Sequence, residues 1–282
     1  MTQKPPGGPE AGPGKAGPVS ELRLRIISAL VLAGAILLAT AWGGWPFRIV
    51  WVLVAGFVAY EWLAMVQRGN AVAAGIGVVV AGFVLGVSPI NQAALAGVAA
   101  AAALTGAIAT PFVRGRLALE ACGMAYALAF ALIAPALRSL PELGLAVIIW
   151  SFAVVWFTDI AAYFTGRRLG GPKLMPSVSP GKTWSGAIGG TIAGTLGGYV
   201  VWALTPAAVP LVGPALVVAG SLAASVFSQM GDLFESSLKR RFGVKDSSRL
   251  IPGHGGFLDR LDGYWAVLVF AGAVLFLTRP GL

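Results

Sequence analysis

Residues 143–165 read LGLAVIIWSFAVVWFTDIAAYFT, an apolar run of 23 residues that contains a single charged side chain, Asp159. A helix needs about 20 predominantly apolar residues to cross the hydrocarbon core of a bilayer. Similar runs occupy most of the 282-residue chain, which is 57% hydrophobic, is 11% charged and has a mean hydropathy of +0.82. A soluble domain carries about 25% charged residues. The composition therefore excludes a water-soluble globule and predicts an all-α polytopic membrane protein.

Nine runs of this kind are predicted, each as one transmembrane helix. Their expected bounds are 26–44, 48–67, 71–88, 92–112, 118–138, 143–165, 184–205, 209–230 and 262–278. Residues 1–25 precede them and include the Pro/Gly-rich stretch KPPGGPEAGPGKAGP. That composition cannot bury enough apolar area to fold, so a disordered cytoplasmic tail is predicted.

The distribution of basic residues predicts the orientation. If the N-terminus is cytoplasmic, 17 of the 20 Lys and Arg residues lie on the cytoplasmic side, and only Arg48, Arg138 and Arg279 lie on the other. Membrane proteins place their excess of Lys and Arg in cytoplasmic loops. The C-terminus is then on the opposite side. The net charge of +9 reflects topology and lipid head groups, and no nucleic-acid partner is predicted. The nine tryptophans lie mostly near predicted span ends and are expected to be interfacial anchors.

The acidic residues gather in one hydrophilic stretch, residues 228–265, SQMGDLFESSLKRRFGVKDSSRLIPGHGGFLDRLDGYW. Five of the eleven acidic side chains of the chain lie there. A helix that continues past residue 231 would place a carboxylate, a hydroxyl and an ammonium group on one face, because positions i, i+4 and i+7 align. These groups belong to Asp232, Ser236 and Lys239.

A second helix that begins near residue 257 would set Asp259 and Asp262 in its first turn. Two carboxylates from different helices suit Mg²⁺, which takes its other ligands from water and substrate phosphates. Nearby Lys and Arg side chains can hold phosphate oxygens. The pattern therefore indicates metal-dependent phosphoryl or nucleotidyl transfer. In the intervening tight turn, IPGHGG, His254 either orients the backbone or contacts phosphate or transfers a proton, and both alternatives stay open.

Further candidates surround the end of the first run quoted. A carboxylate in hydrocarbon is costly, so Asp159 is expected to be functional, the alternative being an ion pair with Arg167 or Arg168. Residues 179–184, SPGKTW, lead into a helix whose N-terminus attracts anions, so a phosphate cradle is predicted there. Glu61, in the second run, has no obvious partner and is expected to have a structural or interfacial role.

Residues 236–262, SSLKRRFGVKDSSRLIPGHGGFLDRLD, resemble the signature of the phosphatidate cytidylyltransferase family without a departure. DIAAYFTGRRLG and SPGKTWSG are similar to a companion motif, although members often carry Lys and Glu where this chain has Gly181 and Ser185. The resemblance implies transfer of a cytidylyl group from CTP to phosphatidic acid, giving CDP-diacylglycerol and pyrophosphate. It places the active site on the cytoplasmic side of the plasma (inner) membrane.

The resemblance also implies roles for individual residues. It makes Asp232 and Asp259 ligands of Mg²⁺, beside a second cation such as K⁺. The catalytic residues are then Asp232, Asp259, Lys239, Ser236 and Asp246. The substrate-binding residues are Lys182, Thr183, Ser179, Arg167, Lys245, Arg260, Asp262, His254 and Arg240. The chain divides into N-terminal transmembrane helices at 26–142 and a C-terminal catalytic region at 143–282 with two cytoplasmic loops.

Two other functions compete with this interpretation. A CTP-dependent polyprenol- or phytol-type lipid kinase would need similar metals and apolar spans. An anion or lipid transporter could line its path with Asp159 and the basic loops. The expected partners are CTP, phosphatidic acid and membrane lipids, and a homodimer is left open.

Overall fold

Nine helices and one β-hairpin make up the regular structure of residues 18–66, 70–88, 91–251 and 253–278, the part of the chain that the computed structural model describes. The helices are α1 (Pro18–Trp42), α2 (Gly44–Met65), α3 (Ala71–Val87), α4 (Gln92–Ala109), α5 (Arg116–Arg138), α6 (Gly144–Leu169), α7 (Trp184–Ala203), α8 (Pro214–Arg241) and α9 (Leu258–Thr278). Each coincides with one predicted run. The all-α membrane architecture is confirmed, and α2, α5, α6, α8 and α9 are long and apolar enough to span a bilayer.

Three boundaries differ from the prediction. The expected tail, residues 1–25, overlaps α1, because residues 21–26, ELRLRI, favour a helix; residues 1–17 lie outside the described residues. The predicted run 209–230 starts later and continues as α8 to Arg241, since residues 232–242 contain neither Pro nor Gly and the next helix breaker after Gly231 is Gly243. The first hydrophilic loop contains the unpredicted antiparallel hairpin of β1 (Lys173–Met175) and β2 (Ser179–Thr183).

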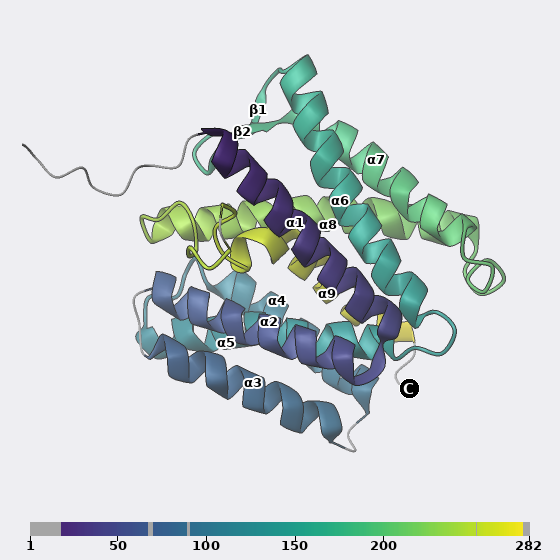
Figure 1. Ribbon diagram of the computed structural model, residues 1–282, viewed down its shortest axis with the longest axis horizontal. Helices are drawn as coiled ribbons and strands as arrows, with labels where there is room; N and C mark the ends of the chain where they lie inside the picture. The colour runs from purple at the N-terminus through teal and green to yellow at the C-terminus, as the bar shows by residue number, and fades with distance from the viewer. Residues whose placement is uncertain (1–17, 67–69, 89–90, 252, 279–282) are drawn as a thin grey trace, which may run out of the picture.

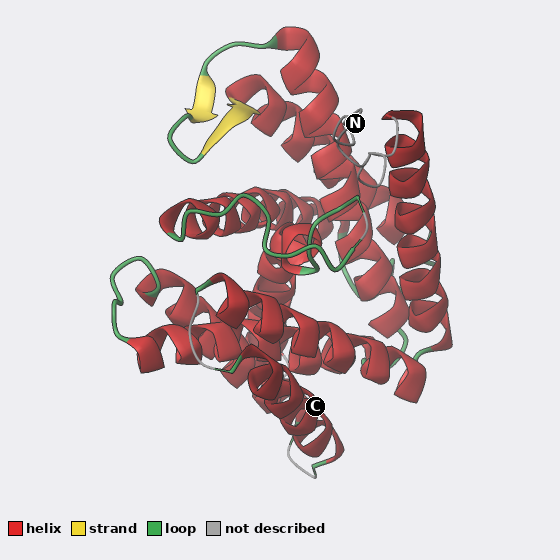
Figure 2. Ribbon diagram, turned by 60° about the vertical axis from the view of Figure 1, so that its left-hand side comes forward, coloured by secondary structure: helices red, strands yellow, loops and turns green. Residues whose placement is uncertain are grey.

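The helices form two groups with α8 and α9 between them (Figure 1). α2, α3, α4 and α5 pack together on one side, and α6 packs along α7 on the other. α9 contacts α4, α5 and α8, so it joins the groups. Figure 2 shows the hairpin extending from the ends of α6 and α7. The strands and the α8–α9 connection therefore lie toward the same end of the helices.

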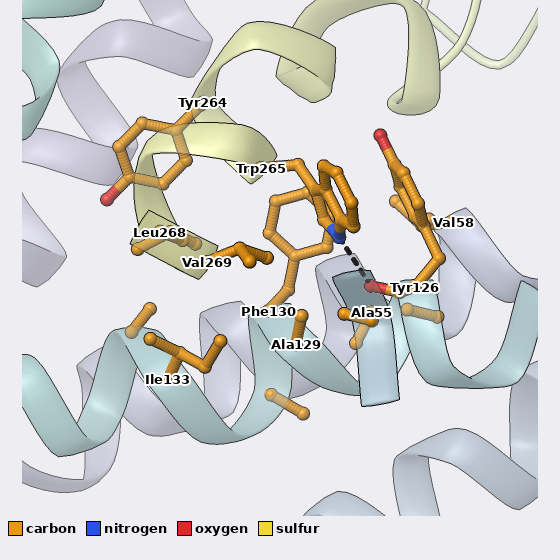
Figure 3. Close-up of a cluster of buried hydrophobic side chains, with 14 of the residues drawn as sticks. Ala55, Val58, Tyr126, Ala129, Phe130, Ile133, Tyr264, Trp265, Leu268 and Val269 are labelled. Carbon is orange, nitrogen blue, oxygen red and sulfur yellow. Dashed lines mark hydrogen bonds between the residues drawn. The ribbon is translucent and has the colours of Figure 1, made fainter. Parts of the chain in front are cut away.

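An aromatic core holds α2, α5 and α9 together. The Trp265 ring stacks on Tyr126 with centroids 4.2 Å apart, and its Nε1 donates to the Tyr126 carbonyl oxygen at 3.0 Å (Figure 3). Trp51 stacks on Tyr264 at 5.2 Å. Trp51, Trp62 and Trp265 are buried, so the prediction that the tryptophans are interfacial anchors is wrong for these three. Their rings supply the large apolar area that fixes α9 against the N-terminal helices.

Glycines allow α6 and α7 to approach each other closely. A Cβ added at Gly186 would lie 2.8 Å from the Ala162 carbonyl oxygen, and one at Gly190 would lie 2.8 Å from that of Thr158. Small residues at such interfaces let membrane helices pack backbone to backbone. This packing fixes the start of α7, to which β2 is attached.

We expect Gly231→Ala to lower stability and Gly220→Ala to leave it unchanged or raise it. An added Cβ at Gly231 would lie 2.8 Å from the Ala266 Cβ and would also meet the Asp262 carbonyl oxygen, whereas at Gly220 it meets nothing within 4 Å. Overpacking costs about 1–3 kcal/mol, while Ala is intrinsically better than Gly in a helix. Thermal unfolding in detergent measures both, and equal midpoints for the two variants would show that α8 and α9 are not in close contact there.

Candidate active site

Polar and charged side chains from five helices and the hairpin meet at one end of the molecule. An ion pair between Lys182 of β2 and Asp232 of α8 joins the two motif regions. On the other side of α9, Glu61 of α2 reaches the backbone of Leu258. The Ser28 hydroxyl of α1 lies 2.9 Å from Nδ1 of His254. The sequence segments that resemble a family signature and its companion motif are thus assembled in one place.

Asp232 is the centre of one half of the site. Lys182 Nζ lies 2.5 Å from its Oδ2, and the Ser236 hydroxyl donates to its Oδ1 at 3.3 Å. The predicted alignment of Asp232 and Ser236 on one helix face is confirmed, whereas Lys239, which was predicted on the same face, pairs with Glu235 and Asp259 instead. Asp159 and Asp262 lie within electrostatic range of Asp232. Carboxyl groups from α6, α8 and α9 therefore lie near Lys182.

Asp259 is the centre of the other half. Lys239 Nζ lies 2.7 Å from Asp259 Oδ1 and also 2.7 Å from Glu235 Oε2. The backbone N–H groups of Ser247 and Gly256 donate to Asp259 Oδ2 at 2.9 and 2.8 Å, and the Ser247 hydroxyl donates to it at 2.9 Å. Asp259 lies in the first turn of α9, as predicted. Its carboxylate is held in a defined orientation by four donor groups.

Glu61 is a site-forming residue that sequence reasoning missed. Its side chain is fully buried and accepts hydrogen bonds from the α8–α9 connection and from the first residues of α9. The expected structural role agrees with these contacts, and no partner was obvious from the sequence because the partners follow Glu61 by almost 200 residues in the chain. Glu235, 1% exposed and beside Lys239, was also missed as a site residue. For Glu61, the one feature of the sequence that could have indicated a site role is a carboxylate inside an apolar run.

Asp159 is exposed at the C-terminal part of α6 and forms no hydrogen bond or ion pair within the described residues. Arg167 instead donates to the Tyr163 hydroxyl at 2.8 Å. The alternative of an Asp159 ion pair with Arg167 or Arg168 is therefore wrong for the structure. The carboxylate remains available to a ligand.

The remaining candidates occupy the rim. The Thr183 hydroxyl accepts from Gly186 N at 3.1 Å and so caps α7. Arg260 Nε donates to the His254 carbonyl oxygen at 2.9 Å, a backbone contact that leaves both interpretations of the imidazole open. Arg240 Nε contacts the Val178 carbonyl oxygen at 3.4 Å. Three further candidates make no such contact with other described residues and are half-buried or exposed on the hairpin and the α8–α9 connection: Ser179, Lys245 and Asp246.

The donor set fits a divalent cation. Within the described residues no three Asp, Glu, His or Cys side chains form a complete ligand group. Mg²⁺, however, usually takes one or two carboxylates and completes its shell with water and substrate phosphates. Asp232 and Asp259 each already face a positive charge, at 2.5 and 2.7 Å, so each is oriented toward a cationic partner.

An apolar cavity lies away from these groups. It has a volume of about 440 Å³ and is lined by apolar parts of α5 to α9, including Trp150, Leu216 and Val274. These residues are near the opposite ends of their helices from Asp159, Asp232 and Asp262. None of the described residues that line this cavity is charged, so it does not suit phosphate chemistry.

Comparisons with known proteins agree with these motifs. The family model described as "Cytidylyltransferase family" matches residues 23–278. A protein of Brucella suis biovar 1 (strain 1330) named "Phosphatidate cytidylyltransferase" is 43% identical over 264 residues, covering 92% of this chain and 93% of the relative. A protein of the same name from Bacillus subtilis (strain 168) is 41% identical over 134 residues, covering 48% of this chain and 49% of the relative.

We expect Thr183→Ala to destabilise the start of α7 and Thr183→Ser to be nearly neutral. The hydroxyl satisfies an N–H group that has no partner within the helix, and replacing such a cap by Ala costs about 1 kcal/mol. Hydrogen exchange of the Gly186 amide measures the effect, with Thr195→Ala, a change in the middle of α7, as the control. Unchanged exchange in Thr183→Ala would show that the hydroxyl does not cap α7, which would favour a direct contact with substrate.

Proposed function

The chain belongs to the cytidylyltransferase family, and from that membership we propose that it transfers the cytidylyl group of CTP to phosphatidic acid, releasing pyrophosphate. The relatives named for this activity support it, one of them across nearly the whole chain. The observation that carries the proposal is the convergence of Lys182 with Asp232 and of Lys239 with Asp259. Alternating ammonium and carboxylate groups are what a metal–triphosphate complex requires.

The reaction needs no protein nucleophile. The phosphate monoester of phosphatidic acid is largely ionised near pH 7, since its second pKa is about 6. One of its oxygens forms a bond to the α-phosphorus of CTP, while the bond from that phosphorus to the bridging oxygen of the β-phosphate breaks. Pyrophosphate leaves with that electron pair. The enzyme supplies position and charge stabilisation, which account for most of the rate in such transfers.

The first half of the site holds the triphosphate and its cation. Mg²⁺, when bound, supplies neutralisation of the phosphate charge. Asp232 is its proposed ligand, and the carboxyl groups of Asp159 and Asp262 lie nearby on neighbouring helices. The Lys182 ammonium would then turn from Asp232 to a phosphate oxygen. The hydroxyl of Ser236 holds the orientation of Asp232.

The second half of the site completes the cation site and binds the lipid phosphate. Asp259 is the second proposed Mg²⁺ ligand, and a second cation such as K⁺ belongs to the same proposal. Lys239, held between two carboxylates, presents its charge to the leaving or attacking phosphate. Half-buried or exposed groups at the rim are proposed to contact phosphate oxygens or the ribose; these are Arg167, Ser179, Arg240, Lys245, Asp246 and Arg260.

The proposed topology has nine spans, a cytoplasmic N-terminus and a cytoplasmic active site. The positions of the arginines support this topology, because arginines predicted on opposite sides of the membrane lie at opposite ends of the helices. Arg48 donates to the Gly86 carbonyl oxygen and Arg138 to that of Thr40, so these two predicted extracytoplasmic charges share one end. Arg241 donates to the Thr110 and Val113 carbonyl oxygens at the other end, where the active site lies. CTP then arrives from the cytosol, and diacyl chains stay in the bilayer.

A mixed-micelle assay with the purified protein, phosphatidic acid and Mg²⁺ separates the candidate functions. CTP labelled at the α-phosphate should transfer its label to the lipid with release of pyrophosphate, because the proposed bond forms at that phosphorus. Label from the γ-phosphate in the lipid would indicate a lipid kinase. A preparation that labels no lipid would favour a transporter.

We expect Asp232→Asn to reduce kcat by at least about 100-fold, because it removes the charge that faces the cation while keeping the shape of the side chain. The same protein should insert and unfold like the wild type. Glu142→Gln, at an exposed turn between α5 and α6, is the matched control and should keep full activity. Near-normal turnover in Asp232→Asn would remove this residue from the metal site.

A further inference from the structure

Glu61 is a buried carboxylate that none of the proposed catalytic steps uses. It lies near the C-terminal end of α2, is 0% exposed and forms no ion pair within the described part of the chain. An unpaired charge in such a place costs several kcal/mol unless hydrogen bonds compensate it. A buried acid that persists at the edge of an active site therefore needs a structural or functional reason.

Hydrogen bonds from a distant segment compensate this carboxylate. Oε1 accepts from the Ser248 hydroxyl at 2.6 Å and from Phe257 N at 3.0 Å, and Oε2 accepts from Leu258 N at 2.7 Å. The first N–H groups of a helix have no intrahelical partner, and negative charge is favourable beside them. Glu61 thus supplies the N-terminal cap of α9 from another helix.

The same carboxylate reaches Asp259 through one intermediate residue. The Ser247 hydroxyl lies 3.2 Å from Glu61 Oε2 and 2.9 Å from Asp259 Oδ2. A hydroxyl has one proton, so it donates to one carboxylate at a time, and the shorter contact favours Asp259. Glu61 keeps its three other donors, which fix the backbone immediately before Asp259.

The glycine before this helix start is explained by the same contact. An added Cβ at Gly256 would lie 2.5 Å from Glu61 Oε1 and would also meet the Ser247 hydroxyl. The chain can pass this close to the carboxylate only without a side chain. Gly256 N meanwhile donates to Asp259 at 2.8 Å, so the turn, the cap and the site carboxylate form one connected network.

We propose that Glu61 is a positioning residue for the cytidylyl transfer, because it fixes the first turn of α9 and so the direction in which Asp259 faces Lys239 and the substrate phosphates. The inference rests on the proposed function for its catalytic consequence. The N-terminal helices carry none of the signature. Through Glu61 they nevertheless contribute one side chain on which the geometry of the site depends.

The test is Glu61→Gln, which keeps the volume but replaces one acceptor oxygen with an NH₂ group that cannot accept a hydrogen bond. Amide exchange at residues 256–259 should become faster. kcat should fall by about 10- to 100-fold and the Mg²⁺ concentration for half-maximal activity should rise, as when the partners of metal ligands are removed. The KM for CTP should change less than kcat. Glu142→Gln is the control and should match the wild type in every measurement.

Two results would overturn the proposal. One is a folded Glu61→Gln protein with wild-type exchange at 256–259 and wild-type kcat. The other is a lower unfolding temperature with kcat and Mg²⁺ requirement unchanged well below it, which would make Glu61 structural only. If Glu61→Gln does not fold, Ser248→Ala removes a single donor to Glu61 and should give the same changes at a few-fold amplitude; wild-type behaviour there would also refute the proposal.

The exchange measurement separates this proposal from the proposed function. It reports the start of α9 whether or not CMP is transferred. A wild-type protein that fails to label lipid would refute the cytidylyltransferase activity and leave the positioning of Asp259 supported by faster exchange. Unchanged exchange with an active wild type would refute the positioning proposal alone.

Discussion

The structure of the site depends on the hydrogen bonds between Glu61 of α2 and the start of α9. The signature-bearing connection between α8 and α9 has little regular structure in its described residues, where Ile251 and Gly255 form an isolated β-bridge. A loop of this kind takes its conformation from what it contacts. Here the contact is a buried carboxylate on a helix that the aromatic core holds rigidly. The position of Asp259 follows from where α9 begins.

The two helix groups accordingly do different work. The N-terminal group provides a closely packed apolar surface, on which Trp51 and Tyr126 stack against aromatic side chains of α9. The C-terminal group supplies the charged side chains. Glycines let α6 and α7 pack closely, and β2, which leads into α7, places Lys182 beside Asp232. Polar contacts link its helices as well, such as the 2.7 Å hydrogen bond between the Thr158 and Ser225 hydroxyls. Sites built on rigid helices hold their geometry better than sites on loops.

Much of this arrangement was predictable from sequence because hydropathy is a local property. All nine apolar runs correspond to helices, and spacing alone put Asp232 and Ser236 on one face. The failures are non-local. The partners of Glu61 are remote in sequence, and burial of Trp62 depends on helix packing that no single span reveals. The β-hairpin was missed because its strands are three and five residues long and contain Pro180. A run of that length carries almost no periodic signal.

The proposed reaction requires that the lipid phosphate itself attacks CTP at a site where carboxylates and ammonium groups alternate. The most direct test is to follow the oxygens of phosphatidic acid whose phosphate carries ¹⁸O at every non-ester position. If the lipid phosphate attacks the α-phosphorus of CTP, every labelled oxygen remains in the lipid product, one of them bridging the two phosphorus atoms, and pyrophosphate carries none. Label in the pyrophosphate, or a lipid product without a cytidylyl group, would contradict it.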